Sequence, residues 1–394
     1  MAQDCLPRTA AADKKDPKTA LVALGVDPWK SLARHPTTLL IQGLVHLHWR
    51  VEWVCLHQRN AAAAEAFCGS DVTIFGPGRV GTKVAWWHHR LYKAASIGGL
   101  ILKGVPPHTA RQRLLHLSID SEVAHRVTRS WERSSRGAEV AFLFGDNPLT
   151  RSLLRCRRLP PSVAYTETGD FRLRRPDFIP LLVERGANVV PNDPADHPDG
   201  VAVADSVLFP VPSRFAPAPR GAKSGTYTIG FVGRIHEYKG LRELIAAAEL
   251  LRRSGMALEV LIVGDGELAP WLLDKLRGCS PWLHVLPGVK DEQELRRIYA
   301  SLDCYVVSSS REANEGVPVS ALEALVCGVP VVAADVGGIR NAIGDLVTIV
   351  SGVDPETLSQ AIRSVLESDR SLSRRSRIPD EVSYATALLQ AVGR

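Results

Sequence analysis

The chain has 394 residues, of which 45% are hydrophobic and 23% charged, and a formal net charge of +6. This length allows two ordinary domains with a sizeable core. No apolar run approaches the ~20 residues that a membrane-spanning helix needs. The seven cysteines are scattered without a Cys-x-x-Cys pair, which argues against a disulfide framework or a structural zinc site.

The amino-terminal half carries most of the positive charge. Residues 1–225 contain 30 Lys and Arg against 20 Asp and Glu, whereas the remainder contains 18 against 22. A basic half favours an anionic partner such as a phosphorylated acceptor or a lipid surface, although a solvated basic face is an alternative. Because aromatic stacking platforms and a recognised module are missing from the sequence, we expect no nucleic-acid partner.

In chain order, a polar disordered tail is expected first, at residues 1–17. The tail lacks an apolar signal core, so a cytoplasmic protein is predicted, with membrane association as an open addition. Short runs rich in Val, Ile and Leu then predict buried strands at 19–26, 50–56, 71–75, 138–144, 162–166 and 187–190, with 207–209 as a late candidate. A helix is predicted at 37–49, between the first two strands.

A second alternating pattern follows a linker rich in Pro, Gly and Ala at 219–226. Strands are expected at 227–233, 258–264, 284–288, 304–310 and 329–335, and helices at 241–255, 268–278, 291–302, around Glu323, and at 355–368. Alternation on both sides of a linker predicts an α/β protein of two doubly wound, Rossmann-like domains facing each other across a cleft. Their expected ranges are 18–218 and 227–394, the second including a terminal helix.

The loop after the strand at 304–310 is a candidate anion site. Pro318 suits the first turn of a helix, so the free amides at the helix amino terminus would point into the cleft beside Gly316. A second glycine loop containing Gly337 follows the neighbouring strand and could add further amides.

Two glutamates accompany this loop. Glu315 could accept hydrogen bonds from a ligand or simply stabilise the helix dipole. Glu323 lies in a run of small and apolar residues, so burial would require a hydrogen-bond donor, which hydroxyls of a sugar or ribose could provide. The alternative is a surface glutamate on a helix of small residues.

Two cations follow the first strand of the second domain. In FVGRIHEYKG, residues 231–240, Gly233 precedes Arg234, and Lys239 comes five residues later. Arginine as a fork and lysine as a point charge suit a diphosphate.

Four stretches in order resemble the retaining glycosyltransferases of the GT-B fold, known as glycosyltransferase family 4. They are FVGRIHEYKGLRELIAA, LIVGDGE, EGVPVSALEAL and GVPVVAADVGG, within about residues 227–370. The resemblance implies a GT-B fold and transfer of a sugar from a nucleoside diphosphate sugar with retention of configuration.

The same resemblance implies roles for individual residues. Glu315 would contact the donor sugar, Arg234 and Lys239 would neutralise the leaving diphosphate, and these three would be the catalytic set. Glu323 would hold the ribose, and the remaining donor-binding positions would be Gly233, Gly264, Val289, Gly316, Val317, Val319 and Gly337. Neither cofactor nor metal is expected, and UDP or GDP would be the nucleotide of the donor.

The first half matches this family loosely. FGDNPLTRSLL resembles the loop and helix after one of its strands, and SVAYTETGD has Thr168 where a histidine is common. Candidates for the acceptor side are therefore Thr168, Asp170 and Asp146. A lipid-linked or phosphorylated acceptor fits the basic first half, and a small natural product is the alternative.

Two further stretches carry other signals. GPGRVGTK, residues 76–83, contains Gly-x-Gly-x-x-Gly, but it follows the third strand and no acidic ribose ligand comes about 20 residues later, so a dinucleotide site is not expected. AWWHHRLYKAASIGGLILKG, residues 85–104, suits a helix lying on lipid, although a core-facing helix is favoured.

The sequence therefore predicts a hexosyl- or glycosyltransferase (EC 2.4) with the donor in the second domain and the acceptor mainly in the first. Two alternatives stay open. A nucleotide-sugar epimerase or hydrolase on the same scaffold would need no acceptor, and a non-catalytic descendant would only bind a partner.

Overall fold

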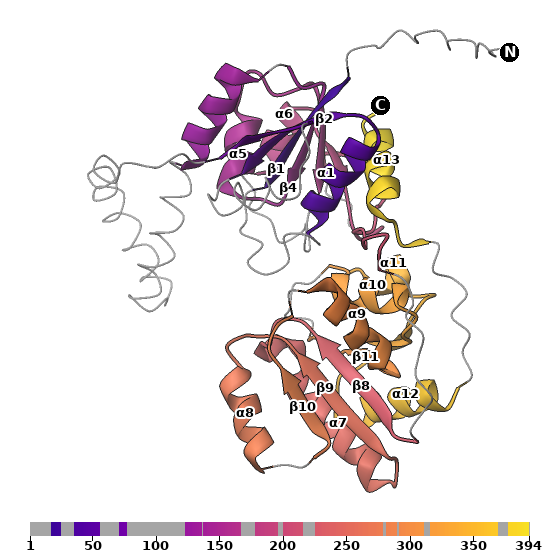
Figure 1. Ribbon diagram of the computed structural model, residues 1–394. Coiled ribbons are helices and arrows are strands. Elements are labelled where there is room, and N and C mark those ends of the chain that lie inside the picture. The colour runs from indigo at the N-terminus through magenta and orange to yellow at the C-terminus, as the bar shows by residue number, and fades with distance from the viewer. Residues whose placement is uncertain are drawn as a thin grey trace, which may run out of the picture.

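The computed structural model forms two parallel β-sheets flanked by helices (Figure 1). The structure describes residues 17–24, 35–55, 71–76, 123–135, 137–166, 178–195, 200–215, 225–278, 281–289, 291–310, 316–368 and 377–393. Among these residues, no helix is both long enough and apolar enough to cross a bilayer.

The first sheet has the order β3-β2-β1-β4-β5-β6-β7, and every pairing in it is parallel. Its strands are β1 (Thr19–Leu24), β2 (Arg50–Cys55), β3 (Val72–Phe75), β4 (Val140–Phe144), β5 (Ser162–Thr166), β6 (Asn188–Val190) and β7 (Ala202–Val203). All five residues of β4 are buried, as expected of a central parallel strand covered on both faces. The accompanying helices are α1 (Pro36–His46), a helix at 123–134, α5 (Pro148–Leu154) and α6 (Ile179–Glu184).

The second sheet has the order β10-β9-β8-β11-β12-β13, again all parallel. Its strands are β8 (Tyr227–Val232), β9 (Leu258–Val263), β10 (Leu283–Leu286), β11 (Cys304–Val307), β12 (Val331–Ala334) and β13 (Thr348–Val350). The helical elements are the 3₁₀ turn η3 (Glu237–Lys239), α7 (Leu241–Arg253), α8 (Ala269–Gly278), α9 (Glu292–Ser301), α10 (Val319–Val326), α11 (Ile339–Ile343) and α12 (Pro355–Glu367).

Several helices begin where a short polar side chain can cap them. Asp291 accepts from the Glu294 amide at the start of α9, and Asp354 accepts from the Thr357 amide at the start of α12. Each cap satisfies an amide that has no partner within the helix. These local signals explain why the boundaries expected from the sequence lie close to those observed.

One predicted strand is wrong. Residues 207–209 are not a strand, and the two residues of β7 complete the sheet instead. The Val207 amide donates to the Pro191 carbonyl rather than to a ladder, and prolines at 210 and 212 lack the amide that pairing requires.

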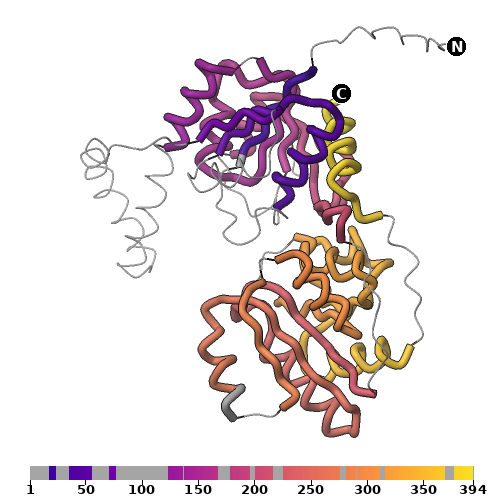
Figure 2. The backbone as a smooth tube through the Cα atoms, viewed as in Figure 1, coloured from indigo at the N-terminus to yellow at the C-terminus, as the bar shows by residue number. Residues whose placement is uncertain are grey.

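The terminal helix α13 (Glu381–Ala391) returns to the first domain. It packs along α1, and the Asn188 side chain of β6 donates to the Ala391 carbonyl. The sequence places this helix with the second domain, which it follows in the chain, whereas its packing partners belong to the first. The tube in Figure 2 shows α13, in yellow, beside α1 of the first domain.

Among the described residues, polar contacts join the domains directly. Asp193, in the loop after β6, accepts a 3.1 Å hydrogen bond from the Asn341 side chain on α11. Arg214, shortly before the second domain, forms an ion pair with Glu292 at the start of α9. Because Asp193 follows a strand of the first sheet and α11 follows β12, the carboxyl edges of the two sheets face each other here.

Candidate functional site

The strand order of the second sheet identifies where a ligand would bind. The chain passes from β8 to β9 and β10 on one side, and β11 to β13 lie on the other. In doubly wound sheets ligands bind beyond the carboxyl ends of the strands where this order reverses. The reversal lies between β8 and β11, so the loops after these two strands form the candidate site.

The loop after β8 carries the predicted pair of cations. Gly233 follows the last residue of β8, Arg234 is exposed, and Lys239 is the last residue of η3. Burial, together with the charge of Arg234, lowers the pKa of Lys239 to about 8. The two cations are therefore close enough to repel each other, and a bound anion would relieve that repulsion.

Three contacts fasten this loop to the end of β11. The Ser308 hydroxyl donates to the Lys239 carbonyl at 2.9 Å, and the Ser310 amide donates to the Tyr238 carbonyl at 2.8 Å. Gly240 has φ +65°, and a Cβ there would lie 1.8 Å from the Ser308 carbonyl oxygen. Only glycine permits this approach, so Lys239 is held against the strand that leads to Gly316.

The Gly-Asp-Gly loop after β9 supports the same region. A Cβ on Gly264 would lie 1.8 Å from the Gly233 carbonyl oxygen, so these two predicted positions are in direct backbone contact. The Asp265 carboxylate accepts a 3.1 Å hydrogen bond from the Gly288 amide. Asp265 thereby fixes the backbone next to Val289, the position expected to face the nucleotide base.

Helix α10 begins at the end of the β11 loop, on the same edge of the sheet as the two cations. Gly316, Val317 and Pro318 precede it, and Val319 is its first residue. No side chain of the described residues caps its amino terminus. The first amides of α10 therefore provide the partial positive charge predicted for an anion site. Gly337 lies in the loop after β12, the neighbouring strand, again as predicted.

Glu323 is buried on α10, with only 3% of its surface exposed. The alternative of a surface glutamate is wrong. The Tyr299 hydroxyl of α9 donates to its Oε2 at 2.7 Å, which supplies the donor that a buried carboxylate requires.

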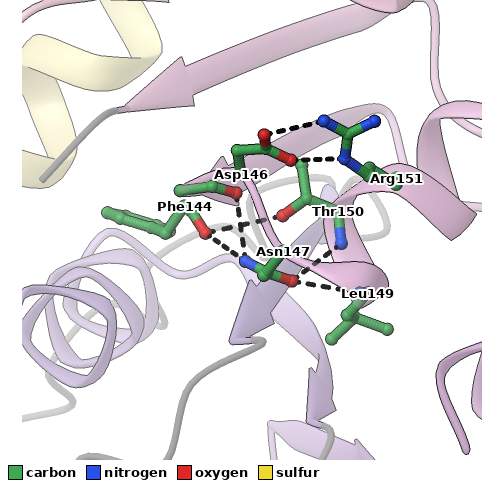
Figure 3. Close-up of polar contacts among 7 residues, drawn as sticks. Phe144, Asp146, Asn147, Leu149, Thr150 and Arg151 are labelled. Carbon is green, nitrogen blue, oxygen red and sulfur yellow. Dashed lines mark hydrogen bonds and ion pairs between the residues drawn. The ribbon is translucent and has the colours of Figure 1, made fainter. Parts of the chain in front are cut away.

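Asp146, predicted for the acceptor side, forms a bidentate ion pair with Arg151 at 2.5 and 2.8 Å (Figure 3). The adjacent Asn147 caps α5 by accepting from the Leu149 and Thr150 amides, and it donates to the Phe144 carbonyl. These contacts fix the loop after β4, which lies where the strand order of the first sheet reverses between β1 and β4. Asp146 therefore sits at the expected edge, with its carboxylate bound to Arg151.

Several predicted residues lie outside the described residues. These are Glu315, Thr168 and Asp170 of the candidate sites, residues 77–83 of the glycine-rich stretch, and the stretch at 85–104. Their roles stay predictions.

Sequence reasoning missed Ser308 and Tyr299. Ser308 lies in a run of three serines at a strand end, which gave no reason to single it out. Tyr299 follows the spacing of Leu295, Ile298 and Leu302, which predicts burial. A buried hydroxyl needs an acceptor and a buried carboxylate needs a donor, but the pairing of Tyr299 with Glu323 required the fold.

Comparison with known proteins supports this assignment of the second domain. The family description "Glycosyl transferases group 1" matches residues 226–368. D-inositol 3-phosphate glycosyltransferase of Geodermatophilus obscurus is 37% identical over 184 residues, and glycogen synthase of Mycobacterium tuberculosis is 32% identical over 168 residues. Each match covers 42% of this chain and 40% of the relative, so it spans less than half of either protein.

Solved structures match nearly the whole chain. Anabaena Alr3699/HepE in complex with UDP and glucose has a TM-score of 0.62 at 13% identity, covering 96% of this chain and 99% of its own. Sucrose-phosphate synthase from Thermosynechococcus elongatus has a TM-score of 0.61 at 14% identity, covering 95% and 94%. At such identities the likeness concerns the fold.

The matches to the second domain and to the whole fold agree with each other and with the strand orders described above. Residues 226–368 therefore form a glycosyl transferases group 1 domain, in a chain whose two parallel α/β domains have the GT-B fold.

Proposed function

We propose that the protein is a glycosyltransferase (EC 2.4) that moves a sugar from a nucleoside diphosphate sugar to an acceptor hydroxyl. The observation that carries this proposal is the placement of Lys239. Its loop, which also holds Arg234, is fastened through Ser308 to the strand before α10, at the point where the strand order reverses. Relatives matched over this domain are named glycosyltransferases, which supports the same activity.

The chemistry follows from where charge develops. When the bond between the sugar and the diphosphate breaks, negative charge accumulates on the leaving phosphate oxygens. Arg234, Lys239 and the first turn of α10 are positive groups that would stabilise this charge. Glu315 would bind hydroxyls of the donor sugar, and Glu323 would bind those of the ribose.

We further propose that the sugar is transferred with retention of configuration and that UDP or GDP is the nucleotide of the donor. The cations and the helix amino terminus would serve in place of a metal. Product anomers resolved by NMR test retention, and turnover in the presence of a chelator tests whether a metal is needed.

The direct test is nucleotide binding followed by turnover. Thermal stabilisation by UDP, GDP, ADP and TDP identifies the nucleotide, because a ligand that binds only the folded state raises Tm. Arg234→Ala and Lys239→Ala should lose this stabilisation, and Glu315→Ala should lose sugar transfer. Lys275→Ala is the matched control, since Lys275 lies on α8 and forms an ion pair with Glu249 at 3.4 Å. Equal stabilisation of Arg234→Ala, Lys239→Ala and the control would overturn the proposal.

The alternatives give different products. An epimerase or hydrolase would convert the nucleotide sugar without an acceptor, releasing an epimer or free sugar. A non-catalytic protein would bind the nucleotide and turn nothing over. Chromatography of the products with and without candidate acceptors, either lipid-linked, phosphorylated or small natural products, separates the three.

The basic first domain suggests a second partner, an anionic membrane surface. Exposed arginines from two segments, the helix at 123–134 and the turn after α5, come together because the Arg158 side chain donates to the Glu132 carbonyl at 2.8 Å. Among the described residues, no carboxylate forms an ion pair with the members of this group, Arg129, Arg133, Arg155, Arg157 and Arg158. An array of exposed guanidinium groups is attracted to anionic lipid headgroups.

Co-sedimentation with vesicles tests this contact. The protein should sediment with phosphatidylcholine vesicles that contain phosphatidylglycerol and stay in solution with phosphatidylcholine alone. Joint substitution Arg129→Glu and Arg133→Glu should release it, whereas Arg253→Glu on the exposed face of α7 should not. Sedimentation that is the same for all three proteins would contradict a role for this surface.

A further inference from the structure

The buried carboxylate of Glu323 is oriented by a tyrosine from a different helix. Tyr299 is 0% exposed and Glu323 3% exposed, and the hydroxyl of Tyr299 lies 2.7 Å from Oε2. A hydrogen bond to an ionised oxygen is stronger than one between neutral groups, and burial keeps water from competing for it. The direction of the carboxylate is therefore set by α9 as well as by its own helix.

Tyr299 is in turn held by rigid neighbours. Its ring lies 6.0 Å from that of Tyr305 on β11, tilted by 60°. The Tyr305 hydroxyl lies 3.0 Å from the Val232 carbonyl at the end of β8 and 2.7 Å from the hydroxyl of Ser320 on α10. Two buried tyrosines thus tie α10 to α9 and to both strands that flank the candidate site.

The two tyrosine contacts lie on one side of α10: Tyr305 contacts Ser320, and Tyr299 contacts Glu323. Ser320 and Glu323 are three residues apart and so lie on neighbouring positions of the same helix face. Rotation of α10 about its axis would break both contacts. The contacts of Tyr299 and Tyr305 therefore fix the rotation of α10 about its axis, and with it the directions of the helix amino terminus and of the Glu323 carboxylate.

We infer that Tyr299 is a positioning residue for nucleotide recognition: its hydroxyl holds the Glu323 carboxylate in the orientation that accepts hydrogen bonds from the ribose hydroxyls of the donor. This inference rests on the proposed function, because it requires Glu323 to meet a ribose. It adds a residue outside the predicted site and a specific consequence, discrimination between ribose and deoxyribose.

The test pairs a protein change with a ligand change. Calorimetry measures Kd of UDP, 2′-deoxy-UDP and 3′-deoxy-UDP for the full-length protein and for Tyr299→Phe. The wild type should prefer UDP by about tenfold or more, because a hydrogen bond to a charged group is among the stronger ones in proteins. In Tyr299→Phe this preference should fall to about twofold, because UDP binding weakens while deoxy-UDP binding changes little.

Tyr384→Phe is a control for the loss of a buried tyrosine hydroxyl away from the candidate site. Tyr384 is also 0% exposed, but it lies on α13 against the first domain. If the loss of a buried hydroxyl acts only through general stability, each variant should change the Kd values of UDP, 2′-deoxy-UDP and 3′-deoxy-UDP by the same factor. A kinetic readout follows the same logic: Tyr299→Phe should raise KM for the donor and leave kcat within about twofold, since the ribose does not react.

Failure of the proposed function and failure of the Tyr299 role give different binding results. A wild-type protein that binds none of the nucleotides refutes the proposed function itself. A wild type that prefers UDP, together with a Tyr299→Phe variant that keeps the full preference, refutes the role of Tyr299. Should Tyr299→Phe fail to fold, Glu323→Gln, which keeps the shape of the side chain and an acceptor for the tyrosine, decides instead. An unchanged ribose preference in Glu323→Gln would refute the inference.

Discussion

The hydroxyl of Ser308 donates a 2.9 Å hydrogen bond to the backbone carbonyl of Lys239, and this contact joins the loops that follow β8 and β11. The contact is made on the main chain of Lys239 and does not involve its ammonium group. It joins the loops that follow two neighbouring strands, β8 and β11, into one surface. The candidate diphosphate site depends on that connection.

Substitution Gly240→Ala tests the connection. The new Cβ would lie 1.8 Å from the Ser308 carbonyl oxygen, and φ is +65°, so the loop must move away from β11. We expect a loss of about 1–3 kcal/mol in the free energy of unfolding and at least a roughly tenfold weaker affinity for the nucleoside diphosphate. Urea unfolding and calorimetry measure the two quantities.

Gly255→Ala is the control for this substitution. Gly255 also has a positive φ, +90°, but a Cβ there would have no atom within 4 Å. It should lose stability through backbone strain alone and keep nucleotide affinity. If Gly240→Ala binds nucleotide as tightly as Gly255→Ala does, the fastening of the Lys239 loop does not matter for binding.

Nucleotide affinity should depend on pH through Lys239. Burial and the charge of Arg234 lower its pKa to about 8 in the free protein, and a bound diphosphate favours the protonated form. Above about pH 8 binding must therefore take up a proton, so Kd should rise by up to about tenfold per pH unit. Below that pH, Lys239 is charged and contributes no pH dependence.

Lys239→Arg provides the comparison, because arginine stays protonated throughout this range. Calorimetry between about pH 7 and pH 9.5 should show the rise in Kd for the wild type and a flat profile for the variant. A wild-type profile that is flat across this whole range would exclude Lys239 as a ligand of the diphosphate.

Acid should destabilise the first domain through His35. The imidazole Nδ1 accepts from the Thr37 amide and caps α1, and burial lowers its pKa from 6.5 to about 4. Between these two values the unfolded chain binds more protons than the folded one, so stability falls as pH drops from 6.5 towards 4. His35→Asn keeps an acceptor at the cap without titrating and should show a shallower fall in urea unfolding across this window.

Glu52 on β2 is a second buried carboxylate, and its role is structural. It accepts from the Trp131 indole nitrogen at 2.6 Å and from the Ser135 hydroxyl at 2.7 Å, both belonging to the helix at 123–134 and its end. Glu52→Ala leaves the buried indole N–H without this acceptor and should lower unfolding free energy by about 2–4 kcal/mol. Glu52→Gln, which retains an acceptor, should lose clearly less, and equal losses would argue against this explanation.

The second domain could be predicted from the sequence more completely than the first. Its buried strands are short Val/Ile/Leu runs bounded by Gly233, Gly264 and Gly328, and its helices have clear amphipathic patterns. Parallel strands of this kind are specified by local composition, and their carboxyl-end loops are then adjacent by topology. For this reason the positions of Arg234, Lys239 and Gly316 could be expected before the fold was known.

Contacts between distant segments could not be predicted in the same way. The pattern of α13 shows that one face is buried, but not that α1 covers it. Likewise, the composition of 207–209 favours a strand, yet the Val207 amide pairs with the Pro191 carbonyl and the nearby prolines interrupt any ladder. The partner of Glu323 belongs to the same class, since β11 separates α9 from α10 in the chain and the two helices meet only in the fold.

The most direct measurement of the central claim is calorimetric binding of a nucleoside diphosphate to the wild type and to Lys239→Ala, at a pH below the Lys239 pKa of about 8. We predict saturable binding to the wild type and binding at least roughly tenfold weaker to the variant, with both proteins unfolding at similar urea concentrations. Binding of equal strength to both proteins, or none to the wild type for UDP, GDP, ADP and TDP alike, would contradict it.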